Sequence, residues 1–480
     1  MLDLLRQTVD RAAGHCAYAE ARHVHTREEH LAVHDELVDA ADAAESEGIG
    51  VRVLVGGAWG FAATRDVSAA GAQDALRRAL AVAAAQPAAG VRPLAPVAPQ
   101  TGHWESTCAI DPFALALEER LAHLFAAAAA MRGDARIVRA DAGAAMMRTT
   151  KALATSDGTA VTQVLTECGA GIAATAVGDG ELQIRTYPCS HGGTVAAAGW
   201  EQVIGLDLVA HAPRVAGEAI ELLTAPVVPD GRRTIVLHGE QLALQLHESI
   251  GHALELDRML LGEASYAGTS WVQPADLGAG LRYGSEHLDV TADATLPGAL
   301  GTFGWDDEGV PGARTPLIER GTLTATLSDR QSAAAIGLDR SGGCARAEGF
   351  ARQPIVRMTN VSLEPGDAGT LAELIADTDD GLYLESNRSW SIDDRRWQFQ
   401  FATEVAREIR AGELGRLYRN ASYAGITPQF WASLDAVCGP SAWHLWGLTN
   451  CGKGEPGQLM HVSHGTAPAR FRDVQVGVAS

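Results

Sequence analysis

Residues 237–257, LHGEQLALQLHESIGHALELD, constrain the fold most, because they place three potential metal-site residues in one helical stretch. His247 and Glu248 are adjacent, and His252 follows five residues after the first histidine. On an ideal α-helix, positions five apart diverge by about 140° around the axis, whereas positions four apart diverge by only about 40°. A regular helix therefore cannot direct both imidazoles at one ion.

A π-bulge would remove this conflict, because it inserts one extra residue into a turn and lets five residues span what four ordinarily do. Gly251, just before His252, lowers the free-energy cost of such a backbone distortion. The sequence therefore predicts a helix that is overwound or bulged between His247 and His252. In the alternative, both histidines are hydrogen-bonded polar residues of a partly buried helix, since a chance match is not very rare among 16 histidines.

A catalytic zinc ion usually has three protein ligands, so the two histidines need a third. Cys451 is the best candidate, because LTNCGKGEPGQLMHVSHG reads as a polar, glycine-rich loop that enters a strand. The competing interpretation of Cys451 is a buried, inert thiol. Glu255, His461 and His464 are alternative ligands, although Glu255 and Asp257 are more simply explained as partners that orient the ligating imidazoles.

Composition excludes several other classes of protein. The formal net charge of -21 would repel a nucleic-acid backbone. No run of about 18 apolar residues is present, and MLDLLRQTVDRAAGHC lacks the layout of a secretory signal, so we expect a cytoplasmic protein without a membrane partner. Seven cysteines without a CxxC pair predict reduced thiols rather than a disulfide framework or a four-cysteine zinc site.

Three further sequence patterns give weaker evidence for a functional site. Gly452, Gly454 and Gly457 match G-x-G-x-x-G, but the sequence after them predicts an extended chain instead of the helix that a dinucleotide site needs. The histidines within residues 15–34 are irregularly spaced among charges, which favours solvated side chains. The acidic residues at 306–308 could bind a substrate amine, but their spacing favours a solvated turn.

The pattern along the chain predicts an α+β protein of two domains, residues 1–225 and 226–480. In the first domain we expect a strand at 51–55, helices at 69–86 and 112–132 with Pro112 in the first turn, short antiparallel strands over 134–195, and a helix within 199–225. PVVPDGRR, residues 226–233, marks the boundary. The second domain is expected to be β-rich and to carry the helix of the HESIGH motif.

Several blocks together resemble the TldD/PmbA metallopeptidases, and more closely the TldD branch. They are HESIGHALELD, GTFGWDDEGVPGARTPLIERGTL followed by RMTN, and CGKGEPGQLMHVSHG; GVRVLVGGAWGFAAT is also similar, so the likeness covers nearly the whole chain. The resemblance implies that His247, His252 and Cys451 bind Zn²⁺ and that Glu248 is the catalytic base. It also implies an α/β N-terminal domain and a β-rich C-terminal domain.

The same resemblance implies a dimer around an enclosed chamber, in which short or unfolded peptides are cleaved. A TldE/PmbA-like companion subunit without the metal motif is often needed in this family, and the present chain, with its full motif, would be the catalytic member. The segment 258–286 is less like the family than the motif is, so the substrate stays open.

The expected reaction is hydrolysis of a peptide bond by metal-activated water, with Glu248 taking the proton and passing it to the leaving amine. A thiolate ligand weakens zinc as a Lewis acid, so additional oxyanion donors are expected, and His464 is a candidate. The peptide would bind as an extended strand along a sheet edge. Two alternatives remain: an amidase acting on a small peptide-derived natural product, and a non-catalytic peptide-binding subunit.

Overall fold

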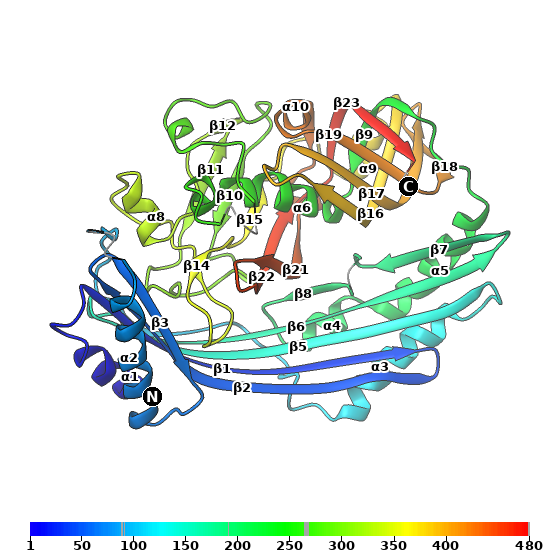
Figure 1. Ribbon diagram of the computed structural model, residues 1–480. Helices are drawn as coiled ribbons and strands as arrows, with labels where there is room; N and C mark the ends of the chain where they lie inside the picture. The colour runs from blue at the N-terminus through cyan, green and yellow to red at the C-terminus, as the bar shows by residue number, and fades with distance from the viewer. Residues whose placement is uncertain (88–89, 91, 191, 264–267, 479–480) are drawn as a thin grey trace.

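The computed structural model describes residues 1–87, 90, 92–190, 192–263 and 268–478. Its N-terminal half forms a long, curved sheet of eight strands in the order β3-β2-β1-β5-β6-β4, with β7 and β8 also paired to β6 (Figure 1). All neighbours are antiparallel except β4 and β6. The strands are β1 Tyr18–His34, β2 Leu37–Val55, β3 Ala58–Thr64, β4 Thr101–Glu105, β5 Ile137–Thr155, β6 Ala160–Gly178, β7 Glu181–Tyr187 and β8 Thr194–Ala196. The predicted short strands of 134–195 thus include two strands of 19 residues.

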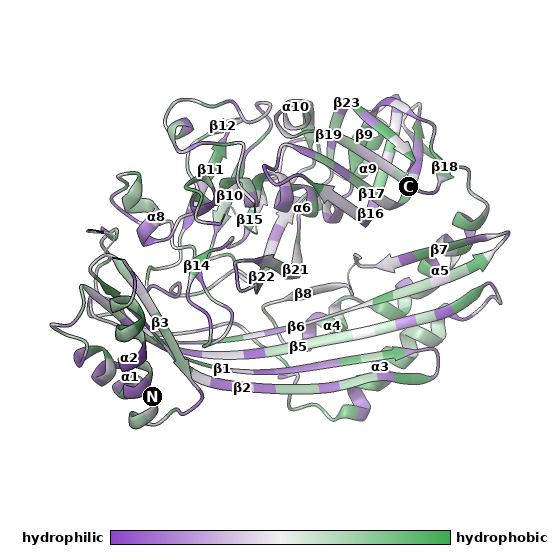
Figure 2. Ribbon diagram, viewed as in Figure 1, coloured by the Kyte–Doolittle hydropathy of each residue, from purple (hydrophilic) through white to green (hydrophobic). Residues whose placement is uncertain are grey.

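Five helices accompany this sheet: α1 Leu2–Asp10, α2 Ala69–Ala84, α3 Leu117–Met131, α4 Glu201–Gly205 and α5 Leu208–Thr224. The helices bury alanine- and leucine-rich faces against the strands, α1 and α2 in one apolar cluster and α3 and α5 in another. Figure 2 shows apolar and polar stretches alternating along β1, β2, β5 and β6. This pattern fits a sheet whose strands pack against apolar cores along some stretches and make polar contacts along others.

The helix predicted at 112–132 begins later, at Leu117. Asp111 accepts a hydrogen bond from the backbone N–H of Phe113 and forms an ion pair with Arg148 of β5. Residues before Leu117 are therefore held in a turn against the sheet, and Pro112 lies in that turn. The contact of Asp111 with a distant strand lies just before the helix start, and local propensity could not reveal it.

The C-terminal half has a mixed seven-stranded sheet in the order β16-β9-β23-β19-β17-β18, with β20 paired to β23, and smaller sheets around it. The α+β fold with a β-rich C-terminal region is confirmed. Its strands are β9 Gly231–Leu237, β10 Val290–Asp293, β11 Arg314–Glu319, β12 Thr322–Leu323, β13 Ala345–Arg346, β14 Ile355–Val356, β15 Val361–Leu363, β16 Asp380–Ile392, β17 Gln398–Arg410, β18 Glu413–Tyr418, β19 Ala421–Ile426, β20 Leu434–Val437, β21 His444–Lys453, β22 Gln458–Thr466 and β23 Ala469–Val478. The helical elements are α6 Gly239–Leu246, η1 His247–Gly251, η2 His252–Leu254, α7 Leu256–Met259, η3 Pro274–Asp276, α8 Arg330–Ala335, α9 Leu371–Ala376, α10 Thr427–Ala432 and η4 Pro440–Ala442.

Ion pairs with buried carboxylates join the two halves. Arg52 of β2 lies 2.7 Å from Glu308, and Lys151 of β5 lies 3.2 Å from Asp307. The acidic stretch at 306–308 is thus buried, and its interpretation as a solvated turn was wrong. The cations that pair with it lie on distant strands, so spacing alone could not show this. Among the described residues, no helix is long and apolar enough to cross a membrane.

Among the histidines of residues 15–34, His15 and His30 are exposed as expected, whereas His23 and His25 make contacts that the sequence did not reveal. His23 on β1 is buried, and its Nε2 lies 2.8 Å from a carboxylate oxygen of Glu47 on the neighbouring β2. His25 makes the same kind of contact with Glu45, at 2.6 Å. In the pairing of β1 with β2, Ile49 lies opposite His23 and Glu47 lies opposite His25, so each contact reaches diagonally to an acidic residue two positions away. These two side chains are thus paired across strands rather than only solvated.

Candidate metal centre

The motif helix contains the predicted distortion. After α6, residues His247–Gly251 form a π-helical turn, and the backbone N–H of His252 donates to the carbonyl of His247, five residues earlier. The prediction of a bulge between His247 and His252 is confirmed. Packing gives a further reason for glycine at position 251, because a Cβ atom there would lie 2.1 Å from Sδ of the buried Met358.

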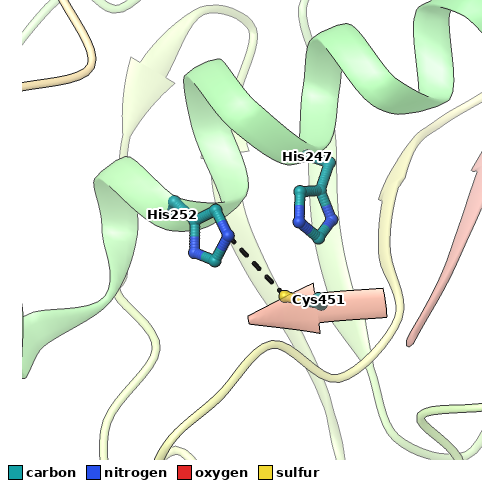
Figure 3. A group of neighbouring side chains, drawn as sticks. All are labelled: His247, His252 and Cys451. Atoms are coloured by element: carbon teal, nitrogen blue, oxygen red, sulfur yellow. Dashed lines mark hydrogen bonds between the residues drawn. The ribbon is translucent and has the colours of Figure 1, made fainter. Parts of the chain in front are cut away.

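The turn brings together three of the candidate ligands (Figure 3). One ligand atom each from His247, His252 and Cys451 lies within 4.8 Å of the others, and all three residues are buried. Cys451 comes from β21, where the pairing with β22 shifts register between Leu448 and Cys451. Such an irregularity re-aims a strand side chain, here toward the motif helix.

The separation between Cys451 and His252 fits a zinc ion. Bonds of about 2.3 Å to sulfur and about 2.05 Å to nitrogen, at a tetrahedral angle, put the two ligand atoms about 3.6 Å apart. The Sγ atom of Cys451 lies 3.6 Å from Nε2 of His252. The donor set of two imidazoles and one thiolate leaves a fourth position for water, which is the pattern of catalytic zinc sites.

Neighbouring groups fix the tautomer of His247. Nδ1 of His464 lies 2.6 Å from the carbonyl oxygen of Val361, which can only accept, so this nitrogen carries the proton. Nε2 of His464 then accepts from Nδ1 of His247 at 2.8 Å. Nε2 of His247 keeps its lone pair, and burial lowers the pKa of His247 to about 4, so the ring is neutral at pH 7.

His464 is therefore a partner of His247. Both of its ring nitrogens are engaged, so the expectation that it donates to an oxyanion is wrong. The other alternative ligand, His461, lies on β22 and contacts Glu167 of β6 at 2.5 Å.

Glu255 orients the second histidine, as predicted. Its Oε2 lies 2.9 Å from Nδ1 of His252, which leaves Nε2 free to face Cys451. Arg258 Nη2 also lies 3.2 Å from that Nδ1, but a guanidinium offers only donors and the carboxylate is nearer. Burial is the largest influence on the pKa of His252 and lowers it, against the opposing effects of Glu255 and Cys451. Burial alone would raise the pKa of Glu255, but Lys453, His252 and Arg258 hold it well below its usual range.

Asp257 does not orient an imidazole as expected. Both of its carboxylate oxygens accept from Nζ of Lys453, at 2.7 and 2.8 Å. Lys453 is fully buried and also donates to the carbonyl of Val356, so Asp257 balances a cation two residues after Cys451.

The surroundings of Cys451 favour its thiolate. Burial opposes ionisation, but His252 and Arg357 outweigh it and lower the pKa of the Cys451 thiol below its ordinary value. Arg357 also donates to the backbone carbonyl of Cys451. The thiolate is the form that binds metal, so this cysteine differs chemically from buried thiols such as Cys344, whose pKa burial raises to about 12.

Glu248 is held by two residues that sequence reasoning missed. Nε1 of Trp390 donates to Oε1 at 3.0 Å, and Nη1 of Arg396 donates to Oε2 at 2.9 Å. Trp390 lies near the end of β16, and Arg396 lies in the turn that leads into β17. Nothing in SWSIDDRRW indicates a partner nearly 150 positions away, so these contacts become visible only in the fold.

The glycines of the G-x-G-x-x-G match lie in the β21–β22 hairpin, and Gly454 takes a φ of +89° in its turn. No helix follows them, since the chain continues directly into β22. The predicted extended chain is confirmed, and the dinucleotide pattern has no structural support.

Comparison with known families and proteins covers nearly all of the chain. Residues 230–478 match the PmbA/TldA metallopeptidase C-terminal domain, residues 19–83 match domain 1, and residues 110–225 match the central domain. A metalloprotease of Methanothermobacter thermautotrophicus is 30% identical over 96% of this chain and 95% of its own. A metalloprotease TldD homolog of Haemophilus influenzae is 24% identical over 96% and 92%, respectively.

One further relative is described as a zinc metalloprotease, and solved structures share the fold of this chain. A zinc metalloprotease TldD homolog of Saccharolobus solfataricus is 26% identical over 52% of each chain. Crystal structures with the same fold include a protein of Thermotoga maritima described as a candidate modulator of DNA gyrase, with a TM-score of 0.77 at 16% identity and 99% of both chains covered. TldE from Thermococcus kodakarensis has a TM-score of 0.71 at 15% identity, with 99% of this chain and 100% of its own covered.

Proposed function

Because this chain belongs to the PmbA/TldD metallopeptidase family, we propose that it is a zinc peptidase of the catalytic type, which hydrolyses short or unfolded peptides. His247, His252 and Cys451 bind the ion, and Glu248 is the general base. One observation carries this proposal: three ligand atoms converge within 4.8 Å, and neighbouring groups leave a free lone pair on each imidazole.

The side chains around the site have defined tasks in this reaction. Zinc, when bound, lowers the pKa of a water molecule and polarises the scissile carbonyl. Glu248 accepts the proton of the attacking water and delivers it to the leaving amine. His464 and Glu255 keep the Nδ1 protons of the two ligating imidazoles in place, and Arg357 and His252 favour the thiolate of Cys451.

We further propose that the peptide binds as an extended strand, because recognition through backbone groups tolerates many side chains. A dimer that encloses the site would exclude folded proteins. The shared fold with a protein named TldE supports pairing with a similar subunit that lacks the metal motif.

Elemental analysis of the purified protein tests the proposal, and Cys451→Ala is the decisive variant. We expect about one zinc ion per chain in the parent protein and much less in the variant. Cys438→Ala is the matched control, because Cys438 is also a buried free thiol but lies outside the three-residue group. Release of new amines from short peptides, measured before and after removal of zinc with a chelator, links the ion to cleavage. A parent protein that contains no zinc would contradict the proposal.

A further inference from the structure

We propose that Trp390 and Arg396 form a clamp that positions the carboxylate of Glu248 for proton transfer. The inference rests on the proposed function, since it assigns two positioning residues to the proposed general base. We call these two side chains the base clamp. They act through Glu248.

The base clamp grips both oxygens of one carboxylate. Trp390 donates to Oε1 and Arg396 donates to Oε2, so rotation about the terminal bond of Glu248 would break two hydrogen bonds. Each carboxylate oxygen has two lone pairs, so each can still accept one proton from another donor. A glutamate on a helical turn otherwise samples several rotamers, and a misplaced base loses much of its effect.

Charge strengthens the second contact. The Arg396–Glu248 pair is largely withdrawn from water, with side-chain exposures of 14% and 10%. A guanidinium–carboxylate hydrogen bond in such surroundings is stronger than one between neutral groups. Arg396 stays charged at neutral pH, because an arginine in a protein does not lose its proton.

The turn that carries Arg396 is itself fixed. Oδ1 of Asp393 accepts from the backbone N–H groups of Arg395, at 3.1 Å, and of Trp397, at 2.8 Å. Thr427 donates from Oγ1 to the carbonyl of Arg396 at 2.7 Å. A mobile loop could not hold Glu248 in one position, whereas hydrogen bonds from Asp393 and Thr427 fix this turn.

A separate segment connects the turn back to the motif helix. The backbone N–H groups of Thr269 and Trp271 donate to the carbonyls of Asp394 and Arg395, both at 2.8 Å. Between them, Oγ of Ser270 donates to the carbonyl of Ala253, at 2.7 Å, in the turn that follows the π-helix. Successive contacts thus connect the motif helix to this segment, the segment to the hairpin turn, and the turn back to Glu248 on the helix. These contacts set the distance between the base and the clamp.

The test compares Arg396→Met with Arg395→Met. Arg395 is the matched control, because it lies in the same turn, carries the same charge and has an exposed side chain. In Arg396→Met we expect kcat to fall about tenfold to a hundredfold, with KM within about twofold and zinc content unchanged. Arg396→Lys keeps a cation and should recover a large part of kcat, and Trp390→Phe should lose less than Arg396→Met. Arg395→Met should behave like the parent.

A binding measurement separates positioning from a structural role. Acetohydroxamate, titrated by calorimetry, reports on a zinc ion with a correctly placed carboxylate beside it. Arg396→Met should weaken its binding about tenfold, but the same change in a Glu248→Ala background should cost less than about twofold, since no carboxylate is left to position.

Three outcomes are decisive. An equal loss in both backgrounds, with zinc retained, would overturn the base clamp and leave the proposed function intact. A loss in Arg395→Met as large as that in Arg396→Met would do the same. A parent protein that binds neither zinc nor acetohydroxamate would instead overturn the proposed function, and the clamp with it.

Discussion

Nε2 of His464 lies 2.8 Å from Nδ1 of His247, and the carbonyl of Val361 fixes the proton on the far side of His464. The two rings are nearly perpendicular, with centroids 4.9 Å apart. This contact decides which nitrogen of His247 has a free lone pair. A ligand that is pre-oriented in this way loses less freedom when it binds an ion.

We therefore expect His464→Ala to weaken zinc binding about tenfold to a hundredfold, although His464 is not a ligand in the proposed site. Competition with a chromogenic chelator measures this affinity. His461→Ala is the control, because His461 lies on the same strand but contacts Glu167 instead of the site. Equal affinities in His464→Ala and the parent protein would contradict the orienting role.

Glu248→Ala should retain zinc and lose cleavage by a factor of about a hundred or more, because no other described carboxylate is assigned to take the proton. Zinc content and the release of peptide amines are measured on the same preparation. Turnover close to that of the parent protein would refute Glu248 as general base.

The stability of the metal-free protein should fall as the pH is lowered from about 6.5 to about 4. Burial lowers the pKa of His247 to about 4, so the unfolded chain binds a proton on this residue before the folded chain does. The unfolded state then binds more protons in this window, and the free energy of unfolding decreases with decreasing pH. The loss from His247 is on the order of a few kcal/mol.

Urea unfolding at pH 7, 5.5 and 4.5 measures this effect, with His247→Gln as the comparison. Other groups that titrate are present in both proteins, so the difference between their slopes isolates His247. Identical pH profiles would show that His247 is not held neutral by the fold.

Gly251→Ala should destabilise the protein by about 1–3 kcal/mol, because the added Cβ would lie 2.1 Å from Sδ of Met358. Met358→Val removes the clashing atom and should restore part of the loss when combined with Gly251→Ala. The urea midpoints of both single variants and the double variant test this coupling. Additive effects would indicate that the clash is relieved elsewhere.

The sequence predicted contacts between residues that lie close together along the chain. The spacing of His247 and His252 required a bulged turn, and Glu255 is close enough along the chain to be recognised as a partner of His252. His464 was expected at the site in another role, and Arg396 was missed, because both reach the motif only through the pairing of distant strands. Asp307 was misjudged for the same reason: its cations, Lys151 and Arg22, lie on the N-terminal sheet.

The position of Cys451 on β21 also bears on when the protein can become active. The two histidines lie near the middle of the chain of 480 residues. Cys451 follows about 200 positions later, and β23, which is made after Cys451, lies between β9 and β19 in the sheet. A nascent chain with only the motif helix therefore has an incomplete set of ligands. The proposed site would therefore be completed only after Cys451 has been made.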